Sequence, residues 1–413
     1  MSGTPTGQGG SQPLIYIIAG EPSGDALGGR LMAALRERSA KPLRFAGIGG
    51  ERMAEQGLDS LVPLHELAIM GVAEVLPRAR RILRRVAEAV AEIQRLRPAA
   101  VVTIDSSGFT WRVAQRLRRQ GERLPLIHYV APMVWAWRAG RARRMARWYD
   151  HLLVLLPFEP PYFTRVGLAC TYVGHPVVES GAGRGDGAAF RQRHGIPPTA
   201  PLLTVLPGSR RGEVARLLPP FAGAVADLAR RHVDLRVVVP TTATVADTVG
   251  AAVRGWPVPT IVVRGEREKY DAFAASDAAL AASGTVALEL AMARLPAVVA
   301  YRISPLTAWL VQRMVKVKYM HLLNLILDRA VVPELRQQDV NAARLGAEVE
   351  RLLADPAARE AQVAQCRHAL HRLGLGELSP SRRAADEVLA IIARHSRDRN
   401  QAVARPETER RTR

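Results

Sequence analysis

The sequence lacks several features that would place it in a class at once. Its two cysteines, Cys170 and Cys366, are too few and too far apart for a disulfide framework, which predicts a reducing, cytoplasmic setting. Charged residues interrupt every apolar stretch well short of the roughly 18 residues that a membrane-spanning helix needs. The first 13 residues have neither a basic start nor an apolar core, and therefore predict a disordered leader and not a signal peptide.

Metal-binding and dinucleotide-binding motifs are also missing. There is no paired Cys/His spacing and no Asp-x-Asp after a predicted strand, so neither a metal nor another cofactor is predicted. The fingerprint G-x-G-x-x-G is absent. A nucleotide-sugar enzyme with this composition would use helix dipoles and arginines, not a divalent ion, to bind a diphosphate.

What the chain does have is length, apolar content and positive charge. Its 413 residues, 48% of them apolar, suggest two domains with two cores. The net charge of +20 favours an anionic partner such as nucleic acid, an acidic membrane or a phosphorylated substrate, although solvated Arg-rich faces would also explain it. No nucleic-acid-binding motif accompanies the charge, so no nucleic acid partner is predicted.

Short β-branched runs alternate with helical patterns along most of the chain, which is typical of parallel βαβ units. The predicted strands of the first half are residues 14–19, 43–48, 99–104, 125–130 and 151–155. Those of the second half are residues 202–206, 235–239, 260–263, 278–281 and 297–300. The fold class is therefore α/β, with two Rossmann-like, doubly wound domains facing a cleft, and ligands at the carboxyl ends of the strands.

The predicted domains are residues 14–179 and 188–378, joined by a flexible Gly-rich linker over 180–187. The chain then becomes helical, with patterns over 340–354, 357–373 and 380–395. The last segment, 379–413, ends in a frayed basic tail. It could cross to the first domain or to a partner subunit, which leaves a homodimer open.

Two turns in the second domain suit a diphosphate. Ser283, Gly284 and Thr285 join a strand to a helix, with Glu289 one turn inside it, where a carboxylate could accept ribose hydroxyls. The alternative is an ordinary turn with a solvated Glu289. Gly208, Ser209 and Arg210 follow the first strand of the same domain, at the same edge of its sheet. Two phosphate-compatible turns in one domain favour the functional interpretation.

In the first domain, the first βα turn contains Ser23, Gly24 and Asp25, which either line the cleft or simply cap a helix. Asp105 follows a buried strand, where partial desolvation would raise its pKa toward that of a useful base; its alternative role is a helix N-cap.

Other side chains of the first half are harder to assign. Trp135 could stack on a sugar or belong to the core, and His175 could be structural, stacking or catalytic. An apolar stretch precedes a basic helix over residues 67–97. This arrangement suits either a peripheral lipid surface or a core helix with a solvated face. The candidate membrane residues are Met70, Val72, Arg81 and Arg85.

Several long motifs, in this order, make the chain resemble the lipid-A-disaccharide synthases over residues 14–338. They are AGEPSGD, LAIMGVAEVLPR, IDSSGF, HYVAPMVWAWR, LPFE, VGHP, LPGSR, ASGTVALE and YMHLLNLILDRAVVPELRQ. The resemblance implies a two-Rossmann-domain (GT-B) glycosyltransferase. It would join UDP-2,3-diacylglucosamine to 2,3-diacylglucosamine 1-phosphate (lipid X) with inversion and without a metal, at the cytoplasmic surface of the inner membrane of a Gram-negative cell. The expected products are a β-1,6-linked disaccharide 1-phosphate and UDP.

The resemblance also implies roles for individual residues. Asp105 matches the essential Asp of the family and would be the general base, and Arg210 would bind the UDP diphosphate. Ser283, Gly284, Thr285 and Glu289 match the nucleotide turn, while the later polar positions of the donor pocket correspond to Asn324, Glu334 and Gln337. Many relatives carry a second acid three residues after the first; here that position is Gly108, which leaves open what orients Asp105. Other enzymes of the same fold, a UDP-sugar 2-epimerase or a lipid-linked muropeptide transferase, are the alternatives.

Overall fold

The computed structural model describes residues 12–67, 75–137, 139–304, 308 and 317–404. The chain forms two compact units, Met1–Pro176 with Glu377–Arg413, and Val177–Gly376. Most of the predicted leader lies outside the described residues. Among the helices that the structure describes, none is both long and apolar enough to cross a membrane.

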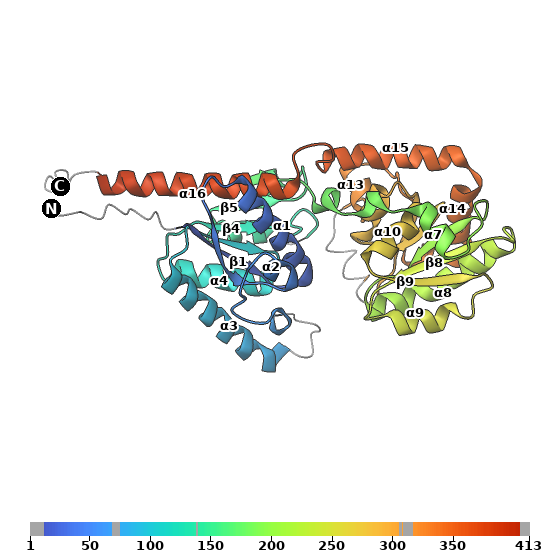
Figure 1. The fold of residues 1–413 in the computed structure, drawn as a ribbon, viewed down its shortest axis with the longest axis horizontal. Helices are drawn as coiled ribbons and strands as arrows, with labels where there is room; N and C mark the ends of the chain where they lie inside the picture. The colour runs from blue at the N-terminus through green and yellow to red at the C-terminus, as the bar shows by residue number, and fades with distance from the viewer. Residues whose placement is uncertain (1–11, 68–74, 138, 305–307, 309–316, 405–413) are drawn as a thin grey trace, which may run out of the picture. The chain divides into compact units, whose positions relative to one another are not determined.

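The first unit contains a parallel sheet whose described strands run in the order β2-β1-β3-β4-β5-β6. Figure 1 labels β1, β4 and β5 of this sheet. Its strands are β1 (Leu14–Ala19), β2 (Arg44–Ile48), β3 (Ala100–Ile104), β4 (Leu126–Tyr129), β5 (His151–Val154) and β6 (Ala169–Tyr172). Its helices are α1 (Pro22–Arg38), α2 (Glu51–Ala54), α3 (Val75–Leu96), α4 (Ser107–Arg119), α5 (Gly140–Met145), α6 (Pro160–Thr164) and α16 (Pro380–Ala404).

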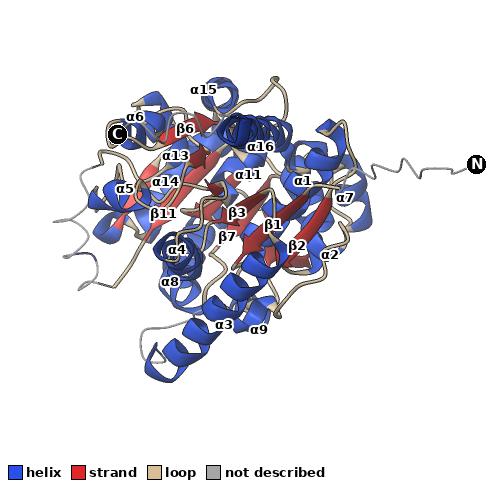
Figure 2. Cartoon of the chain, turned by 90° about the vertical axis from the view of Figure 1, so that its left-hand side faces the viewer, coloured by secondary structure: helices blue, strands red, loops and turns tan. Residues whose placement is uncertain are grey.

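Alternating side chains of each strand serve two cores, one on each face of this sheet. Ile15 and Ile17 of β1 pack with apolar residues of α1 and α16. Tyr16 and Ile18 pack instead with residues of α3 and α4. Figure 2 shows α1 and α16 side by side over one face, with α3 and α4 on the other. Helix α16 therefore lies on the N-terminal part of its own chain, and it extends to Ala404, further than its sequence pattern predicts.

The second unit repeats this layered arrangement, with the strand order β12-β11-β10-β7-β8-β9 in its described sheet. Its strands are β7 (Leu202–Leu206), β8 (Arg236–Thr241), β9 (Thr260–Arg264), β10 (Ala278–Ala282), β11 (Ala297–Tyr301) and β12 (Glu334–Arg336). Its helices are α7 (Gly187–Arg193), α8 (Arg211–Ala229), α9 (Ala246–Val253), α10 (Glu266–Ala275), α11 (Val286–Met292), α13 (Leu322–Leu327), α14 (Ala342–Ala354) and α15 (Pro356–Arg372).

Each sheet has one point where the strand order reverses. In the first unit, this point lies between β1 and β3, and in the second between β7 and β10. Loops leave the carboxyl ends of two such strands in opposite directions and open a crevice, which is where doubly wound sheets bind ligands. The turns that follow β1, β3, β7 and β10 are those that contain Gly20, Asp105, Ser209 and Gly284.

The predicted α/β class, with two Rossmann-like sheets and a helical C-terminal segment, is confirmed. Two strands were not predicted. β6 is a half-exposed edge strand, and β12 is three residues long with a charge at each end, so neither has an apolar run.

The stretch predicted as a flexible linker, residues 180–187, is packed in the second unit. Ala182 is buried in its core, and the backbone N–H of Asp186 donates to Asp271 of α10 at 2.8 Å. The abundance of glycine in this stretch reflects close packing on α10, and this prediction of flexibility was wrong.

Candidate active site

A cavity of about 740 Å³ opens at the reversal point of the second sheet. This volume lies within the usual range of small-molecule sites. Its walls come from the loops after β7, β8, β9 and β10 and from the first turns of α10 and α11. At the end of β8, the hydroxyl of Thr241 is buried with no hydrogen-bond partner among the described residues.

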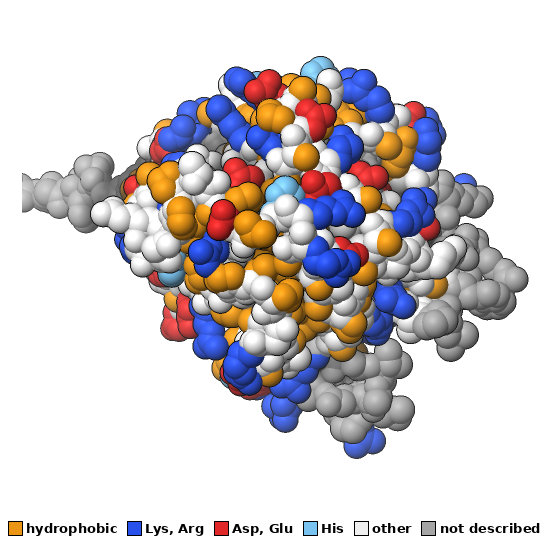
Figure 3. All heavy atoms as spheres, turned by 90° about the vertical axis from the view of Figure 1, so that its right-hand side faces the viewer, with side chains coloured by type: hydrophobic (Ala, Val, Ile, Leu, Met, Phe, Trp, Pro, Cys, Tyr) orange, Lys and Arg blue, Asp and Glu red, His pale blue; other side chains and the backbone are white. Residues whose placement is uncertain are grey.

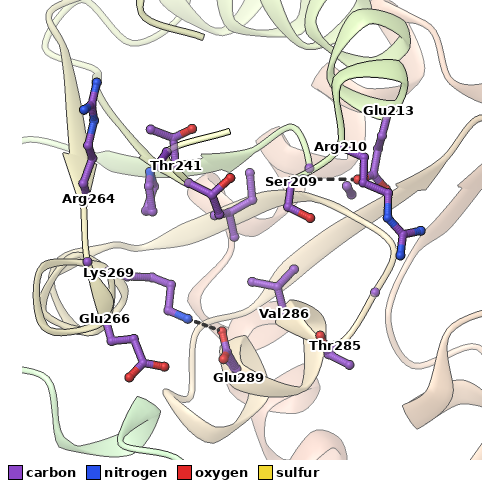
Figure 4. A pocket seen from close by; sticks show the side chains of 18 of the residues that line it. Ser209, Arg210, Glu213, Thr241, Arg264, Glu266, Lys269, Thr285, Val286 and Glu289 are labelled. Atoms are coloured by element: carbon purple, nitrogen blue, oxygen red, sulfur yellow. Dashed lines mark hydrogen bonds and ion pairs between the residues drawn. The ribbon is translucent and has the colours of Figure 1, made fainter. Parts of the chain in front are cut away.

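The turn after β7 depends on glycine. Gly208 has a φ of +115°, and a Cβ there would lie 2.2 Å from a carboxylate oxygen of Glu213. That carboxylate accepts the backbone N–H of Ser209 at 3.2 Å and so closes the turn. Arg210 is the N-cap residue of α8 and is exposed, so its guanidinium is accessible to an anion at one end of the cavity (Figure 4).

Glu289 lies at the other end of the cavity. Lys269 of α10 binds its Oε2 at 2.8 Å, and the hydroxyl of Tyr270 donates to its Oε1 at 3.3 Å. Figure 4 shows the Lys269 side chain reaching Glu289 across the floor of the pocket. The solvated Glu289 that the sequence left open is therefore not what the structure has. Helix α11 begins after Thr285 with no side-chain cap.

The predicted donor residues divide into two groups. Those that line the cavity are Gly208, Ser209, Arg210, Ser283, Gly284, Thr285 and Glu289. The other three are Asn324, Glu334 and Gln337, which do not line it.

Each of these three braces the backbone. Buried Asn324 accepts two N–H groups and donates to the carbonyl of Val332. The carboxylate of Glu334 accepts the N–H groups of Met320 and His321, and Gln337 bonds both polar groups of the Ile303 backbone. Their polar atoms are used to shape the segment around β12.

The turn after β3 holds Asp105 in an unusual conformation. Asp105 and Ser106 both have left-handed φ values, +45° and +43°, which cost energy for residues other than glycine. Burial raises the pKa of Asp105 above its usual range, and a hydrogen bond from the Ser106 backbone opposes that rise. The carboxyl group is therefore more basic than an exposed aspartate, as a general base needs.

Close contacts hold the backbone of this turn, in which Gly108 stands where many relatives have the second acid. The N–H of Asp105 donates to the carbonyl of Tyr129 at 2.9 Å. The buried hydroxyl of Thr110 lies 2.7 Å from the carbonyl oxygen of Asp105 and 3.0 Å from that of Ser106. A Cβ on Gly20, in the turn after β1, would lie 2.2 Å from the Ser106 Oγ. The two turns at the reversal point therefore touch.

The other predicted residues of the first βα turn have different surroundings. Asp25 is buried, and its carboxylate accepts the backbone N–H groups of Gly50, Arg52 and Met53. It fastens the start of α2 and does not cap α1. Ser23 is exposed in the first turn of α1, and Gly24 is buried beneath it.

Trp135 is half-buried, and Glu159 and Phe158 hold its ring in place. Its Nε1–H donates to the Glu159 carboxylate at 3.3 Å, and its ring packs edge-on against Phe158. Glu159 is buried, which raises its pKa to about 7. Burial lowers the pKa of His175 to about 4, so this imidazole is neutral at pH 7.

The predicted membrane residues are only partly described. Met70 and Val72 lie outside the described residues. Arg81 is exposed on α3, but Arg85 is held by Glu66 at 2.6 Å and by Glu88 at 2.6 Å. Arg85 therefore ties α3 to the neighbouring turn. On the face shown in Figure 3, basic side chains are interspersed with acidic and apolar ones, so the net charge does not form a continuous basic surface there.

Lys269, Arg264 and Thr241 line the cavity and were missed by the sequence analysis. A usable signal existed for two of them, because Thr241 and Arg264 are the last residues of β8 and β9, at the ligand-binding edge of the sheet. Lys269 had no such signal. Among the described residues, no group of three or more His, Cys, Asp or Glu side chains could hold a metal ion.

Solved structures with the same arrangement define the class. The UDP-GlcNAc 2-epimerase of Neisseria meningitidis, solved with UDP-GlcNAc bound, matches with a TM-score of 0.60 at 10% identity over 92% of this chain and 100% of its own. MurG of Acinetobacter baumannii matches with a TM-score of 0.54 at 13% identity over 93% of this chain and 99% of its own. The fold is therefore of the GT-B type.

Sequence relatives narrow the class to a family. The model of the family described as lipid-A-disaccharide synthetase matches residues 15–388. The lipid-A-disaccharide synthase of Rhodospirillum centenum is 59% identical over 381 residues, 92% of this chain and 95% of the relative. That of Paramagnetospirillum magneticum is 57% identical over 389 residues, 94% of this chain and all of the relative. The chain belongs to the lipid-A-disaccharide synthase family, glycosyltransferases of lipid A biosynthesis.

Proposed function

We propose that this chain transfers a 2,3-diacylglucosamine unit from UDP to lipid X, with inversion, to form the β-1,6-linked disaccharide 1-phosphate. The observation that carries the proposal is the position of the motif residues. Seven of them line one cavity at the reversal point of the second sheet, and Asp105 stands at that of the first. Both positions are where doubly wound sheets bind ligands.

The second unit would bind UDP and its sugar. Arg210 would pair with the diphosphate by charge-assisted hydrogen bonds, and the turn of Ser283–Thr285 would contact it from the other strand. Because these groups stabilise the diphosphate more as it leaves with its full charge, they would lower the barrier as well as bind the donor. Glu289 would accept the hydroxyls of the ribose.

In the first unit, Asp105 would take the proton from the 6-hydroxyl of lipid X while the hydroxyl oxygen attacks the anomeric carbon. Inversion needs one base on the face opposite the leaving group, so a single acid in the motif suffices. Its raised pKa keeps the group basic enough to accept this proton. A carboxyl group that is already protonated cannot do so, and activity should therefore fall at acid pH.

The test is a turnover assay with the purified full chain, UDP-2,3-diacylglucosamine and lipid X, in detergent with EDTA. The expected result is equimolar UDP and disaccharide 1-phosphate, with a β anomeric configuration by NMR. A parallel reaction without lipid X should release no UDP. UDP release without disaccharide would point to another acceptor, and epimerisation of a UDP-sugar would place the chain with the epimerases. An α linkage would overturn inversion.

We also propose that α3 meets the anionic surface of the inner membrane. Leu83 is 54% exposed on this helix between the exposed arginines Arg81 and Arg84. Leu83→Ser should weaken co-sedimentation with vesicles that contain phosphatidylglycerol. Val233→Ser, at an apolar residue that is 89% exposed in the second unit, is the matched control. Equal binding of the two variants would overturn the assignment to α3. Whether the chain forms a homodimer stays a prediction, which light scattering would check.

A further inference from the structure

Lys269 is a charged residue of the cavity that neither the motifs nor the proposed reaction assigns. It lies in the first turn of α10, and its ammonium group binds Glu289 at 2.8 Å. The same ammonium stands 4.6 Å from the centre of the Tyr270 ring. The Tyr270 hydroxyl, in turn, donates to the other oxygen of Glu289. Lys269 and Tyr270 therefore hold both oxygens of one carboxylate.

These two contacts restrict the rotation of the Glu289 carboxylate. The Lys269 and Glu289 side chains are 22% and 21% exposed, so the pair is shielded from most of the solvent that would weaken it. A carboxylate held on both oxygens cannot rotate freely, and each oxygen keeps lone-pair capacity for another donor. The rotational freedom that a ligand would otherwise have to restrict is already lost.

The pair also alters the charge of the cavity. Glu289 lines the same cavity as Arg210 and the Ser283–Thr285 turn, where the proposed ligand carries a diphosphate. An unpaired carboxylate there would repel that anion, and the ammonium of Lys269 cancels most of the repulsion. Glu289 can then serve as an acceptor of neutral hydroxyl groups without weakening the binding of the phosphates.

We infer that Lys269 is a positioning residue that makes the nucleoside subsite depend on the ribose hydroxyls, by fixing Glu289 as their acceptor. The inference rests on the proposed function, since it takes a nucleoside diphosphate as the ligand of this cavity. Tyr270 supports the same carboxylate more weakly, through a longer and uncharged donor.

Calorimetry on the full chain with UDP and with 2′,3′-dideoxy-UDP tests the inference. The wild type should bind UDP roughly 10- to 100-fold more tightly than 2′,3′-dideoxy-UDP, because the dideoxy nucleotide cannot form the hydrogen bonds from the ribose hydroxyls to the carboxylate. Lys269→Met should reduce this ratio by about fivefold or more, mainly by weakening UDP. Lys269→Arg should restore part of it. Tyr270→Phe should reduce the ratio less than Lys269→Met does, and Lys41→Met, at an exposed lysine of the first unit, should not change it.

The outcomes separate the inference from the function beneath it. If Lys269→Met binds UDP less tightly but keeps the wild-type ratio, Lys269 contributes only charge, and the inference is wrong. If the wild type binds UDP and 2′,3′-dideoxy-UDP equally, Glu289 does not bind the ribose and the inference is wrong, but the proposed diphosphate site is not affected. If the wild type does not bind UDP, the proposed function itself is overturned. Should Lys269→Met unfold, an unchanged ratio in both Lys269→Arg and Tyr270→Phe would still overturn the inference.

Discussion

The two units place their candidate residues at the same point of the sheet, where the strand order reverses, but they build these sites differently. In the first unit, one carboxyl group stands in a strained, partly buried turn. In the second, polar groups from four strand ends surround a cavity of about 740 Å³. The first arrangement suits a group that must react, and the second suits a ligand that must be held.

This difference has an energetic consequence. A reacting group has no substitute, and its position matters to a fraction of an ångström. A binding cavity instead distributes its interaction energy over several contacts, so the loss of one contact costs a part of the affinity. We therefore expect the largest effects in the first unit and on turnover, and smaller effects in the second unit and on binding.

The most severe expected effect is that of Asp105→Asn. The amide cannot accept the proton, so kcat should fall roughly 10²- to 10⁴-fold, while the Kd for UDP should stay within about twofold. Steady-state turnover and calorimetry check the two halves of this prediction. Asp59→Asn, at an exposed carboxylate of the same unit, is the matched control. Turnover near that of the wild type would remove Asp105 from the role of base.

Gly20→Ala tests whether the strained turn itself matters. The new Cβ would meet Ser106 Oγ at 2.2 Å and Ser106 Cβ at 2.5 Å, so the turn that carries Asp105 must shift. We expect kcat to fall roughly 10- to 100-fold, because a displacement of about 1 Å can have this effect. The double variant Gly20→Ala/Ser106→Gly removes both clashing atoms and should recover much of the rate.

The control for this experiment is Gly140→Ala, because a Cβ at Gly140 would meet nothing within 4 Å. If Gly20→Ala is as active as this control, the contact between the two turns does not position Asp105. The strained conformation of the Asp105 turn would then not distinguish the first site from the cavity of the second unit in its effect on turnover.

In the second unit, Arg210→Ala should weaken UDP binding roughly 10- to 100-fold by removing a charge-assisted contact with the diphosphate. Because the other contacts of the cavity remain, the variant should still bind UDP at high concentration. Its kcat at saturation should change less than that of Asp105→Asn. Arg211→Ala, at the next exposed arginine, is the control. An unchanged UDP affinity in Arg210→Ala would move the diphosphate site elsewhere.

Sequence patterns predicted the parts of this comparison that depend on local order. Short, β-branched apolar runs marked ten of the strands, and residues such as Ser209 and Gly284 were found because they follow strands. The position of Asp105 after β3 follows from the same rule. Its left-handed φ does not, because Asp and Ser adopt that conformation in only a small share of their occurrences.

What the sequence could not show depends on packing between distant segments. Lys269 and Glu289 are 20 residues apart and meet only because α10 and α11 pack into the same core cluster. Asn324 resembles a ligand-binding residue in its motif, yet its amide is consumed by the backbone of Val331 and Val332. Polar residues in a motif have the same appearance whether they face a ligand or brace a loop, and hydrogen-bond partners decide between the two.

The smallest expected effect on turnover is that of Glu159→Gln. This variant tests whether burial alone, or the position at the strand reversal, makes a carboxyl group essential for turnover. Glu159 is another buried carboxyl group of the first unit, with its pKa raised to about 7 from an ordinary 4.5, but it follows β5, away from the point where the strand order reverses. If burial alone made a base, its loss would matter as much as that of Asp105. We expect turnover at pH 7 to stay within about threefold, because the amide oxygen of Gln can still accept the Trp135 N–H.

Stability should nevertheless respond to this substitution in a pH-dependent way. Between pH 4.5 and 7 the folded state keeps a proton on Glu159 that the unfolded state releases, so the wild type loses stability as the pH rises through this window, by at most about 3 kcal/mol. Glu159→Gln cannot titrate, and its stability relative to the wild type should increase from pH 5 to pH 8. Urea unfolding of both proteins across this range measures the difference, in which the other titrating groups cancel. A difference in unfolding free energy that stays constant with pH would show that Glu159 does not have the raised pKa. A large loss of turnover in Glu159→Gln would mean that burial, and not the position at the strand reversal, makes a carboxyl group of this unit essential.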